Sequence, residues 1–182
     1  MKVTKTSIEG LLIIEPRIFN DDRGYFYESY NKSKFTEAGV DVEFVQDNQS
    51  FSQKGAVRGL HGQANPFAQS KLVRVIKGSV IDVALDIRKG SPTYGQHFSI
   101  ELSEENKLQF WIPAGFLHGF SVLEDDTIFT YKVNNYYDKA SEIGVIWNDP
   151  NLNIDWVISH GEALLSPKDE LLPAFSAFQS PF

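Results

Sequence analysis

The sequence VRGLHGQANPFAQSKLVRV, residues 57–75, decides how the rest of the chain can fold. It begins as an apolar run typical of a β-strand, breaks at two glycines, and resumes as a second strand at Lys71. Arg58, His61 and Lys71 gather at the interruption. A charge is costly to bury unless a partner or a ligand compensates it. We therefore interpret this corner as the mouth of a β-barrel into which the three side chains point.

The spacing within this corner makes a further prediction about the backbone. Arg58 and His61 are three positions apart, so they cannot share one face of a regular strand. A bend at Gly59 would allow both side chains to point into the barrel. With that bend, Arg58 could hold a ligand oxygen or a phosphate through a pair of hydrogen bonds.

The remaining segments alternate as short β-strands do. The clearest alternation lies in residues 79–87, with one apolar face and one mixed face: Ile81, Val83, Leu85 and Ile87 against Asp82, Ala84 and Asp86. We expect further strands at residues 11–15, 25–30, 42–45, 71–76, 98–102, 109–113, 119–123 and 127–133. Such closely spaced short strands indicate an all-β sandwich or jelly roll.

Helices are few, and the length fits one domain. A short helix is expected at residues 31–38, capped by Asn31 or Ser33, and another at residues 166–172. The 182 residues divide into an N-terminal β arm (about 1–50), a barrel (about 51–135) and an irregular or helical C-terminal segment (about 136–182). The tail from Pro173 is either loosely ordered or packed on a partner.

Composition excludes several classes of protein. The net charge of −7 argues against nucleic-acid binding, and the chain has no cysteine for disulfides or thiolate metal sites. No apolar run approaches the roughly 20 residues of a membrane span, and no export signal is recognised, so we expect a cytoplasmic protein. A surplus of phenylalanine, 14 residues, and free strand edges favour a homodimer.

A second motif, WIPAGFLHGF at residues 111–120, contains the pattern Pro-x-Gly-x-x-His. It resembles the second motif of the cupins, which are double-stranded β-helices, or jelly-roll barrels. Metal-binding cupins have two histidines one residue apart in a first motif, where this chain reads His61-Gly62-Gln63. The other histidines, His97 and His160, leave little to complete a site. We therefore predict a cupin barrel without metal or cofactor, which disfavours a metal-dependent oxygenase.

The order and spacing of eight motifs resemble those of the dTDP-4-dehydrorhamnose 3,5-epimerases, from about Ile8 to Pro173. The motifs are RGLH (58–61), KLVRV (71–75), DVALDIR (82–88), SPTYG (91–95), PAGFLHGF (113–120), YK (131–132), WND (147–149) and SPKD (166–169). The resemblance implies an enzyme that inverts C3 and C5 of dTDP-4-dehydro-6-deoxy-D-glucose, the step before reduction to dTDP-L-rhamnose. Its partner would be a thymidine-diphosphate 4-keto-6-deoxy sugar.

This chemistry needs a base, a group that stabilises an enolate oxygen, and an acid on the opposite face, because both carbons lie α to the C4 ketone. His61 is the best base, being neutral yet basic near pH 7, and Lys71 can place a positive charge at the oxyanion. The resemblance implies that Asp169 holds the other ring nitrogen of His61 and that Tyr131 is the acid. Without the resemblance, Tyr131 would usually be interpreted as a tyrosine of the barrel wall whose hydroxyl bonds to a neighbouring residue.

The resemblance also implies residues that bind the nucleotide. They are Arg23, Glu28, Gln46, Asn48, Arg58, Glu142 and Lys168, with Tyr137 stacking on the base. His118 either lines the pocket and stabilises an oxygen or is structural. Arg23 and Glu28 could instead form surface ion pairs; in a homodimer, an N-terminal arm that crosses over could bring them to the neighbour's site.

One position departs from the family. Its members commonly carry an aromatic residue after the histidine, where this chain has Gly62. The missing ring could widen the pocket or loosen His61. A mono-epimerase or ketoisomerase on the same substrate class therefore stays open as an alternative, since single-position epimerases share this scaffold. From a different class, the alternative is a non-catalytic sugar-binding barrel, which would lack an acid–base pair.

Overall fold

The computed structural model describes residues 1–182, except for the side chain of residue 160. Its strands are β1 (Lys2–Lys5), β2 (Leu12–Glu15), β3 (Phe19–Asp21), β4 (Gly24–Phe26), β5 (Gln46–Ser52), β6 (Val57–Gln63), β7 (Lys71–Lys77), β8 (Ser79–Asp86), β9 (His97–Ser103), β10 (Gln109–Ile112), β11 (Phe116–Val122), β12 (Thr127–Val133) and β13 (Glu142–Gly144). The helices are α1 (Lys32–Glu37) and four 3₁₀ turns, η1 (Lys139–Ser141), η2 (His160–Glu162), η3 (Asp169–Leu171) and η4 (Phe175–Ala177).

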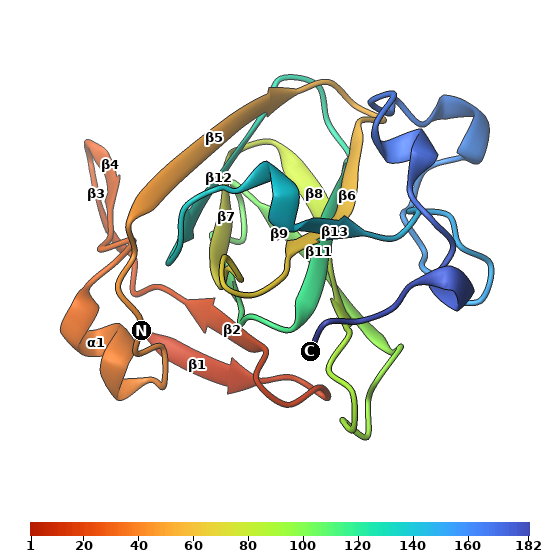
Figure 1. Ribbon diagram of the computed structural model, residues 1–182. Helices are drawn as coiled ribbons and strands as arrows, with labels where there is room; N and C mark the ends of the chain where they lie inside the picture. Colours follow the sequence, from red (N-terminus) through yellow and green to blue (C-terminus); the bar gives the residue numbers. More distant parts are fainter.

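Two antiparallel sheets form the barrel. Strands β1-β2-β10-β7-β12-β5 make a six-stranded sheet and β13-β6-β11-β8-β9 a five-stranded one, while β3 and β4 form a separate hairpin. Figure 1 shows α1 and this hairpin on one side of the barrel and the C-terminal segment on the other, while β1 and β2 of the predicted N-terminal arm belong to the six-stranded sheet. The fold is therefore the predicted all-β jelly roll, and β1, β5, β9 and β13 are the edge strands of its two sheets.

The alternation predicted in residues 79–87 is present in β8, and both of its faces are buried. Ala84 packs into the cluster between the two sheets, whereas Val83 and Leu85 pack into a second cluster under the C-terminal segment. Asp82 and Asp86 are fully buried among the side chains of this strand's neighbours. A strand in the middle of a sheet that is covered on both sides leaves no polar face for solvent, so these carboxylates need partners within the chain.

Several boundaries differ from the sequence predictions. The strand predicted at residues 42–45 is wrong: the strand forms in the polar run that follows, as β5, where seven residues pair with β12. Strand β4 is shorter than predicted, β1 was not predicted, and the expected helix at residues 166–172 is only the turn η3. Cross-strand pairing overrides local hydrophobicity here, because a polar strand is acceptable when its inward face lines a cavity.

The predicted helix is confirmed as α1. Its cap is Asn31, whose side chain accepts a hydrogen bond from the Lys34 backbone N–H. Phe35 buries the helix against β2 and β10, in a third cluster that contains Ile14 and Trp111. The helix thereby ties the N-terminal arm to the six-stranded sheet.

The C-terminal tail packs on its own chain. Phe175, Phe178 and Phe182 cover the outer face of the five-stranded sheet. The backbone N–H of Phe175 donates to Asp149 Oδ2 at 2.6 Å, and the N–H of Lys89 donates to the Phe182 carbonyl at 2.9 Å. No helix in the described part of the chain is long and apolar enough to cross a membrane.

Candidate active site

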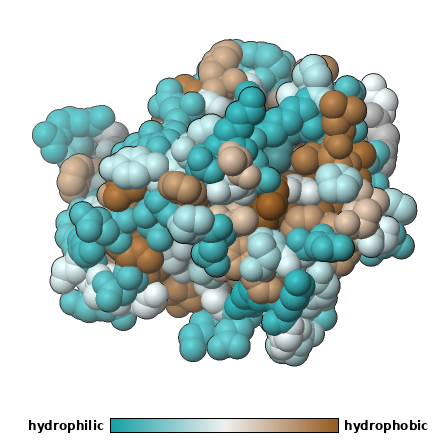
Figure 2. All heavy atoms as spheres, viewed as in Figure 1, coloured by the Kyte–Doolittle hydropathy of each residue, from teal (hydrophilic) through white to brown (hydrophobic). Residues whose placement is uncertain are grey.

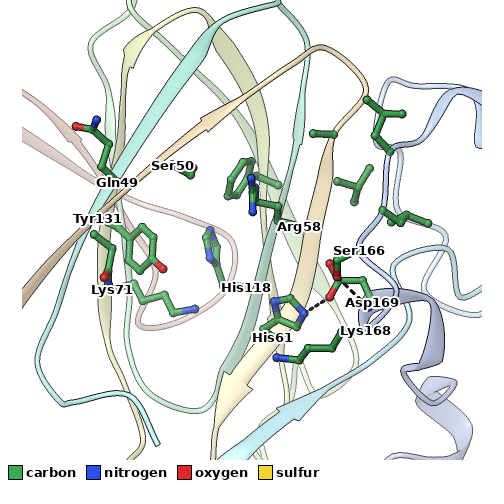
Figure 3. Close-up of a pocket in the computed structure, with 16 residues that line it drawn as sticks. Gln49, Ser50, Arg58, His61, Lys71, His118, Tyr131, Ser166, Lys168 and Asp169 are labelled. Atoms are coloured by element: carbon green, nitrogen blue, oxygen red, sulfur yellow. Dashed lines mark hydrogen bonds and ion pairs between the residues drawn. The ribbon is translucent and has the colours of Figure 1, made fainter. Parts of the chain in front are cut away.

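A cavity of about 650 Å³ opens at the mouth of the barrel. Five strands and the C-terminal segment contribute its walls: Asn48, Gln49, Ser50, Ala56, Val57, Arg58, His61, Lys71, His118, Phe120, Tyr131, Leu164, Leu165, Ser166, Lys168 and Asp169. Figure 3 shows the polar side chains converging on it from β5, β6, β7, β11 and β12. The cavity therefore gathers residues from most of the motifs that the sequence analysis singled out.

The bend predicted at Gly59 is present. The residue has φ +129°, and the register between β6 and β11 shifts at this point, between the partners of His118 and Phe120. A Cβ at Gly59 would lie 2.5 Å from Gly119 Cα, so the two backbones approach too closely for any other residue. As a result both Arg58 and His61 line the cavity.

His61 and Asp169 form a pair at the cavity wall, with 2.6 Å between His61 Nε2 and Asp169 Oδ1. Burial acts to raise the pKa of Asp169, but hydrogen bonds from His61 and Ser166 and the charge of Lys168 hold it below its ordinary value. An ionised Asp169 accepts the proton of Nε2, which leaves Nδ1 as the basic nitrogen of a neutral ring. The pair can therefore work as an oriented base.

Lys71 and Tyr131 lie on the six-stranded sheet, across the cavity from β6 (Figure 3). Lys71 Nζ is 5.9 Å from the centre of the Tyr131 ring. Burial lowers the pKa of Lys71 to about 8, against the opposing effect of the negative charge on Asp82. Burial raises the pKa of Tyr131, with a smaller opposite effect from Arg58, so the phenol keeps its proton near neutral pH.

The Tyr131 hydroxyl makes no hydrogen bond to any described residue. A tyrosine in a barrel wall usually bonds its hydroxyl to a neighbouring residue. Within the described residues that neighbour is missing, and the ring lines the cavity beside Phe129. A protonated hydroxyl in this position can donate to a bound molecule.

His118 lies deeper in the same cavity and is paired with Asp82. Its Nε2 is 2.9 and 3.0 Å from the two carboxylate oxygens of Asp82. Burial lowers the pKa of His118 despite the nearby Asp82 charge, which acts to raise it. The ring also stacks on Phe129, so His118 is held rigidly while one edge lines the cavity.

Polar residues at the cavity rim are held in place by their neighbours. Arg58 Nη2 donates to Ser52 Oγ at 3.2 Å, and Gln46 Nε2 donates to Asn48 Oδ1 at 2.8 Å. Gln46 itself lies outside the cavity lining. The basic side chain of Lys168 reaches the rim in an ion pair with Glu142, which lies in an adjoining groove that shares His61 and Lys168 with the main cavity.

Five of the expected binding residues lie outside the cavity lining of their own chain: Gln46 and Glu142, already placed above, and Arg23, Glu28 and Tyr137. Arg23 is 90% exposed and paired with Asp21 on the β3–β4 hairpin. Glu28 is paired with Lys34 beside α1, and Tyr137 is exposed. Within one chain, Arg23 and Glu28 thus form the surface ion pairs that the sequence analysis kept as an alternative.

Sequence reasoning missed several residues that build the site. The polar run at residues 46–50 fits a barrel interior or a solvated loop equally well on composition, and it forms most of β5; Ser52, which follows Asn48 and Ser50 on the inward face, was missed. Asp82 shares a face of β8 with Ala84, as the alternation predicted, but the alternation did not show that this face points inward. The apolar side chains of Phe120, Leu164 and Leu165 give no indication of a site in the sequence. They line the cavity only because of how they pack.

Gly62 lies on the opposite face of β6 from His61. A Cβ built there would meet Leu117 Cδ2 at 3.0 Å, the Phe116 carbonyl oxygen at 3.3 Å and Ile143 Cγ1 at 3.6 Å. These atoms belong to the packed side of the sheet, since Leu117 and Ile143 are in the cluster under the C-terminal segment. The expectation that a missing ring here widens the pocket is therefore wrong.

Apart from the undescribed side chain of residue 160, no group of three or more His, Cys, Asp or Glu residues is placed to hold a metal ion. His97 lies on β9 and is absent from the cavity lining. His160, counted in the sequence analysis, lies outside the described side chains.

The barrel and its polar mouth define a cupin-type jelly roll with a small-molecule site inside it. A family model described as dTDP-4-dehydrorhamnose 3,5-epimerase matches residues 5–177, and the chain belongs to this family. It is 55% identical over 170 residues to the dTDP-4-dehydrorhamnose 3,5-epimerase of Shigella flexneri, covering 93% of each chain.

Solved structures agree with this assignment. The crystal structure of dTDP-4-dehydrorhamnose 3,5-epimerase from Elizabethkingia anophelis superposes with a TM-score of 0.93 at 51% identity, covering 97% of each chain. A dTDP-6-deoxy-D-glucose-3,5-epimerase from Legionella pneumophila, in complex with dTDP-4-keto-L-rhamnose, gives a TM-score of 0.94 at 48% identity, over 98% of this chain and 94% of that one.

Proposed function

We propose that this protein inverts C3 and C5 of dTDP-4-dehydro-6-deoxy-D-glucose, giving dTDP-4-dehydro-L-rhamnose. One observation carries the proposal: His61 on β6, paired with Asp169 of η3, faces Tyr131 on β12 across a single cavity (Figure 3). A base and an acid on opposite walls allow a proton to leave one face of a carbon and another to arrive on the other face. Family membership supports this substrate and this reaction.

His61 would begin the reaction by removing the proton from a carbon next to the C4 ketone. Asp169 stabilises the imidazolium that results, because its carboxylate already accepts the hydrogen bond from Nε2. The electron pair moves onto the ketone oxygen, where the positive charge of Lys71 stabilises the enolate. Electrostatic stabilisation of this kind is commonly worth about 3–4 kcal/mol of the barrier.

Tyr131 would complete the inversion. Its phenol returns a proton to the same carbon from the opposite face, and the ketone reforms. The buried phenol holds a raised pKa and so remains a donor at neutral pH. Afterwards His61 loses its proton and Tyr131 regains one from solvent, so each inversion consumes no other reactant and no redox cofactor.

The rim of the cavity is suited to the nucleotide end of the substrate. Arg58 and Lys168 supply positive charge for the diphosphate, and Asn48 supplies an amide. Gln46, Glu142 and Tyr137 lie farther out and would contact the nucleoside.

Because the β3–β4 hairpin exposes Phe19, Tyr25 and Phe26, we also propose a homodimer in which Arg23 and Glu28 serve the neighbouring site. A cytoplasmic location fits an enzyme that uses a nucleotide-activated sugar.

The decisive experiment is incubation with the 4-keto substrate in deuterated water. We expect deuterium at both C3 and C5 of the product, detected by NMR or mass spectrometry, because each carbon receives a proton from an exchangeable group. Label at one carbon alone would identify a mono-epimerase, the second candidate. A sugar-binding barrel without acid–base chemistry would produce no label.

A substitution at the base tests the assignment of His61. His61→Asn should abolish exchange at both carbons while leaving the affinity for thymidine diphosphate within about twofold, since the smaller amide stays polar but is not a base. Gln63→Asn, two positions along β6 and outside the cavity lining, controls for local disturbance of the strand. Exchange that persists in His61→Asn would refute the assignment.

A further inference from the structure

In the described part of the chain, the Ser50 hydroxyl oxygen is buried in the cavity wall and has no hydrogen-bond partner. In Figure 3 it lies on β5, between Tyr131 and Arg58. Buried polar atoms in folded proteins nearly always hydrogen-bond, and the exceptions call for an explanation. A hydroxyl that faces a substrate cavity has a simple one: its partner is the substrate.

The neighbouring inward-facing side chains of β5 are already engaged. Asn48 accepts a hydrogen bond from Gln46 at 2.8 Å, and Ser52 accepts one from Arg58 at 3.2 Å. Ser50 lies between them on the same face of the strand, opposite Phe129 of β12. Along β5, the Ser50 hydroxyl therefore lies between the level of Tyr131 and the level of Arg58.

The strand register indicates which part of a sugar lies beside Ser50. Asn48 pairs with Tyr131, whereas Ser52 contacts Arg58, and successive inward-facing residues are about 7 Å apart. A pyranose ring is of comparable width. A sugar with its diphosphate at Arg58 and its reacting carbons near Tyr131 would therefore place its first and second carbons at the level of Ser50.

This inference rests on the proposed function. We propose that Ser50 Oγ hydrogen-bonds to the C2 hydroxyl of the sugar and so determines specificity for a 2-hydroxylated substrate. The ring oxygen, on the other side of C1, is a weaker partner because it can only accept. A serine hydroxyl rotates freely and can both donate and accept, which matches a sugar hydroxyl.

The test compares two substrates with two enzymes. We would measure kcat/KM for wild type and Ser50→Ala with the 4-keto-6-deoxy substrate and with its 2-deoxy counterpart. We expect Ser50→Ala to lower kcat/KM about tenfold for the hydroxylated substrate and to leave the 2-deoxy substrate within about twofold of wild type. The wild type should prefer the hydroxylated substrate by a similar factor.

Ser52→Ala is the matched control, since this neighbouring serine contacts Arg58 and should affect both substrates equally. The melting temperature of substrate-free Ser50→Ala should not fall, because the hydroxyl has no bond in the free protein to lose. Equal losses for both substrates in Ser50→Ala, or no loss for either, would overturn the assignment. A wild type that epimerises neither substrate would overturn the proposed function and this inference with it.

Discussion

Among single residues, Lys71 stands in an electrostatic conflict with its surroundings. Its ammonium is buried, which disfavours the charge, while the role proposed for it requires that charge at the enolate. Asp82 opposes the effect of burial and is itself held by His118. These opposing effects leave the pKa of Lys71 at about 8. The ammonium is therefore mostly charged at neutral pH, and it loses its charge as the pH rises through about 8.

We therefore predict that kcat falls as the pH rises through about 8. Lys71 is protonated below its pKa, so raising the pH removes the charge that stabilises the enolate. Asp82→Asn removes the carboxylate that favours the charged form, and it should shift this fall in kcat to lower pH. A pH–rate profile checks both points, and Lys77→Met, at the exposed end of β7, is the control. An identical profile for Asp82→Asn would contradict the prediction.

Tyr131→Phe should separate proton removal from proton return. The ring remains to pack against Phe129, but the donor on the opposite face is lost. Epimerisation should fall about 10²- to 10⁴-fold, the usual contribution of a positioned acid or base, whereas deuterium exchange into recovered substrate should fall less. Parallel measurement of both rates is the test, and an equal loss in the two would remove Tyr131 from the role of acid.

Among the elements, β5 and the C-terminal segment contribute most to the site. β5 is a strand because it pairs with β12 along its length, and its polar inward face then lines the cavity. The C-terminal segment brings Asp169 against β6, and its tail returns across the outer face of the five-stranded sheet. The tail is anchored by Asp149, a buried carboxylate that accepts backbone N–H groups from Asn151 and Phe175.

Removal of this anchor should destabilise the protein. Asp149→Ala leaves two backbone donors without their partner, and we expect a loss of about 2–4 kcal/mol in the free energy of unfolding. Asn151→Ala is the control, since only its backbone takes part in the contact, and it should change stability by less than about 0.5 kcal/mol. Urea denaturation measures both. Equal stability of the two variants would show that Asp149 does not hold the tail.

On the scale of the whole molecule, the hydrophobic surface is unevenly distributed. The face seen in Figure 2 is largely hydrophilic with scattered apolar residues. The β3–β4 hairpin concentrates three exposed aromatic residues, and it also carries the Arg23 that its own cavity does not receive. A hairpin that inserts into a second copy of the chain would explain both features.

Subunit mixing tests this arrangement. Arg23→Ala should raise KM, because the diphosphate loses a positive partner, and His61→Asn should be inactive. When the two variants are mixed and allowed to exchange subunits, each mixed dimer should regain one site with both wild-type residues. We expect part of the activity to return with a wild-type KM. A mixture that shows only the KM of Arg23→Ala would mean that Arg23 does not serve the neighbouring site.

The sequence alone determined the barrel class and most of the chemistry in its cavity. Period-two alternation identified β8 and β12, and the glycine break at residue 59 correctly predicted a bend, because both signals depend on neighbouring residues only. The ordered motifs pointed to His61, Lys71 and Tyr131, and the structure gathers them in one cavity.

Only the tertiary structure decided what depends on contacts between distant parts of the chain. His61 and Asp169 are 108 residues apart, and no local pattern brings them to 2.6 Å. Likewise, β5 is a strand only because β12 pairs with it. These features arise from how the sheets close, and closure is set by the summed pairing and burial of the whole chain.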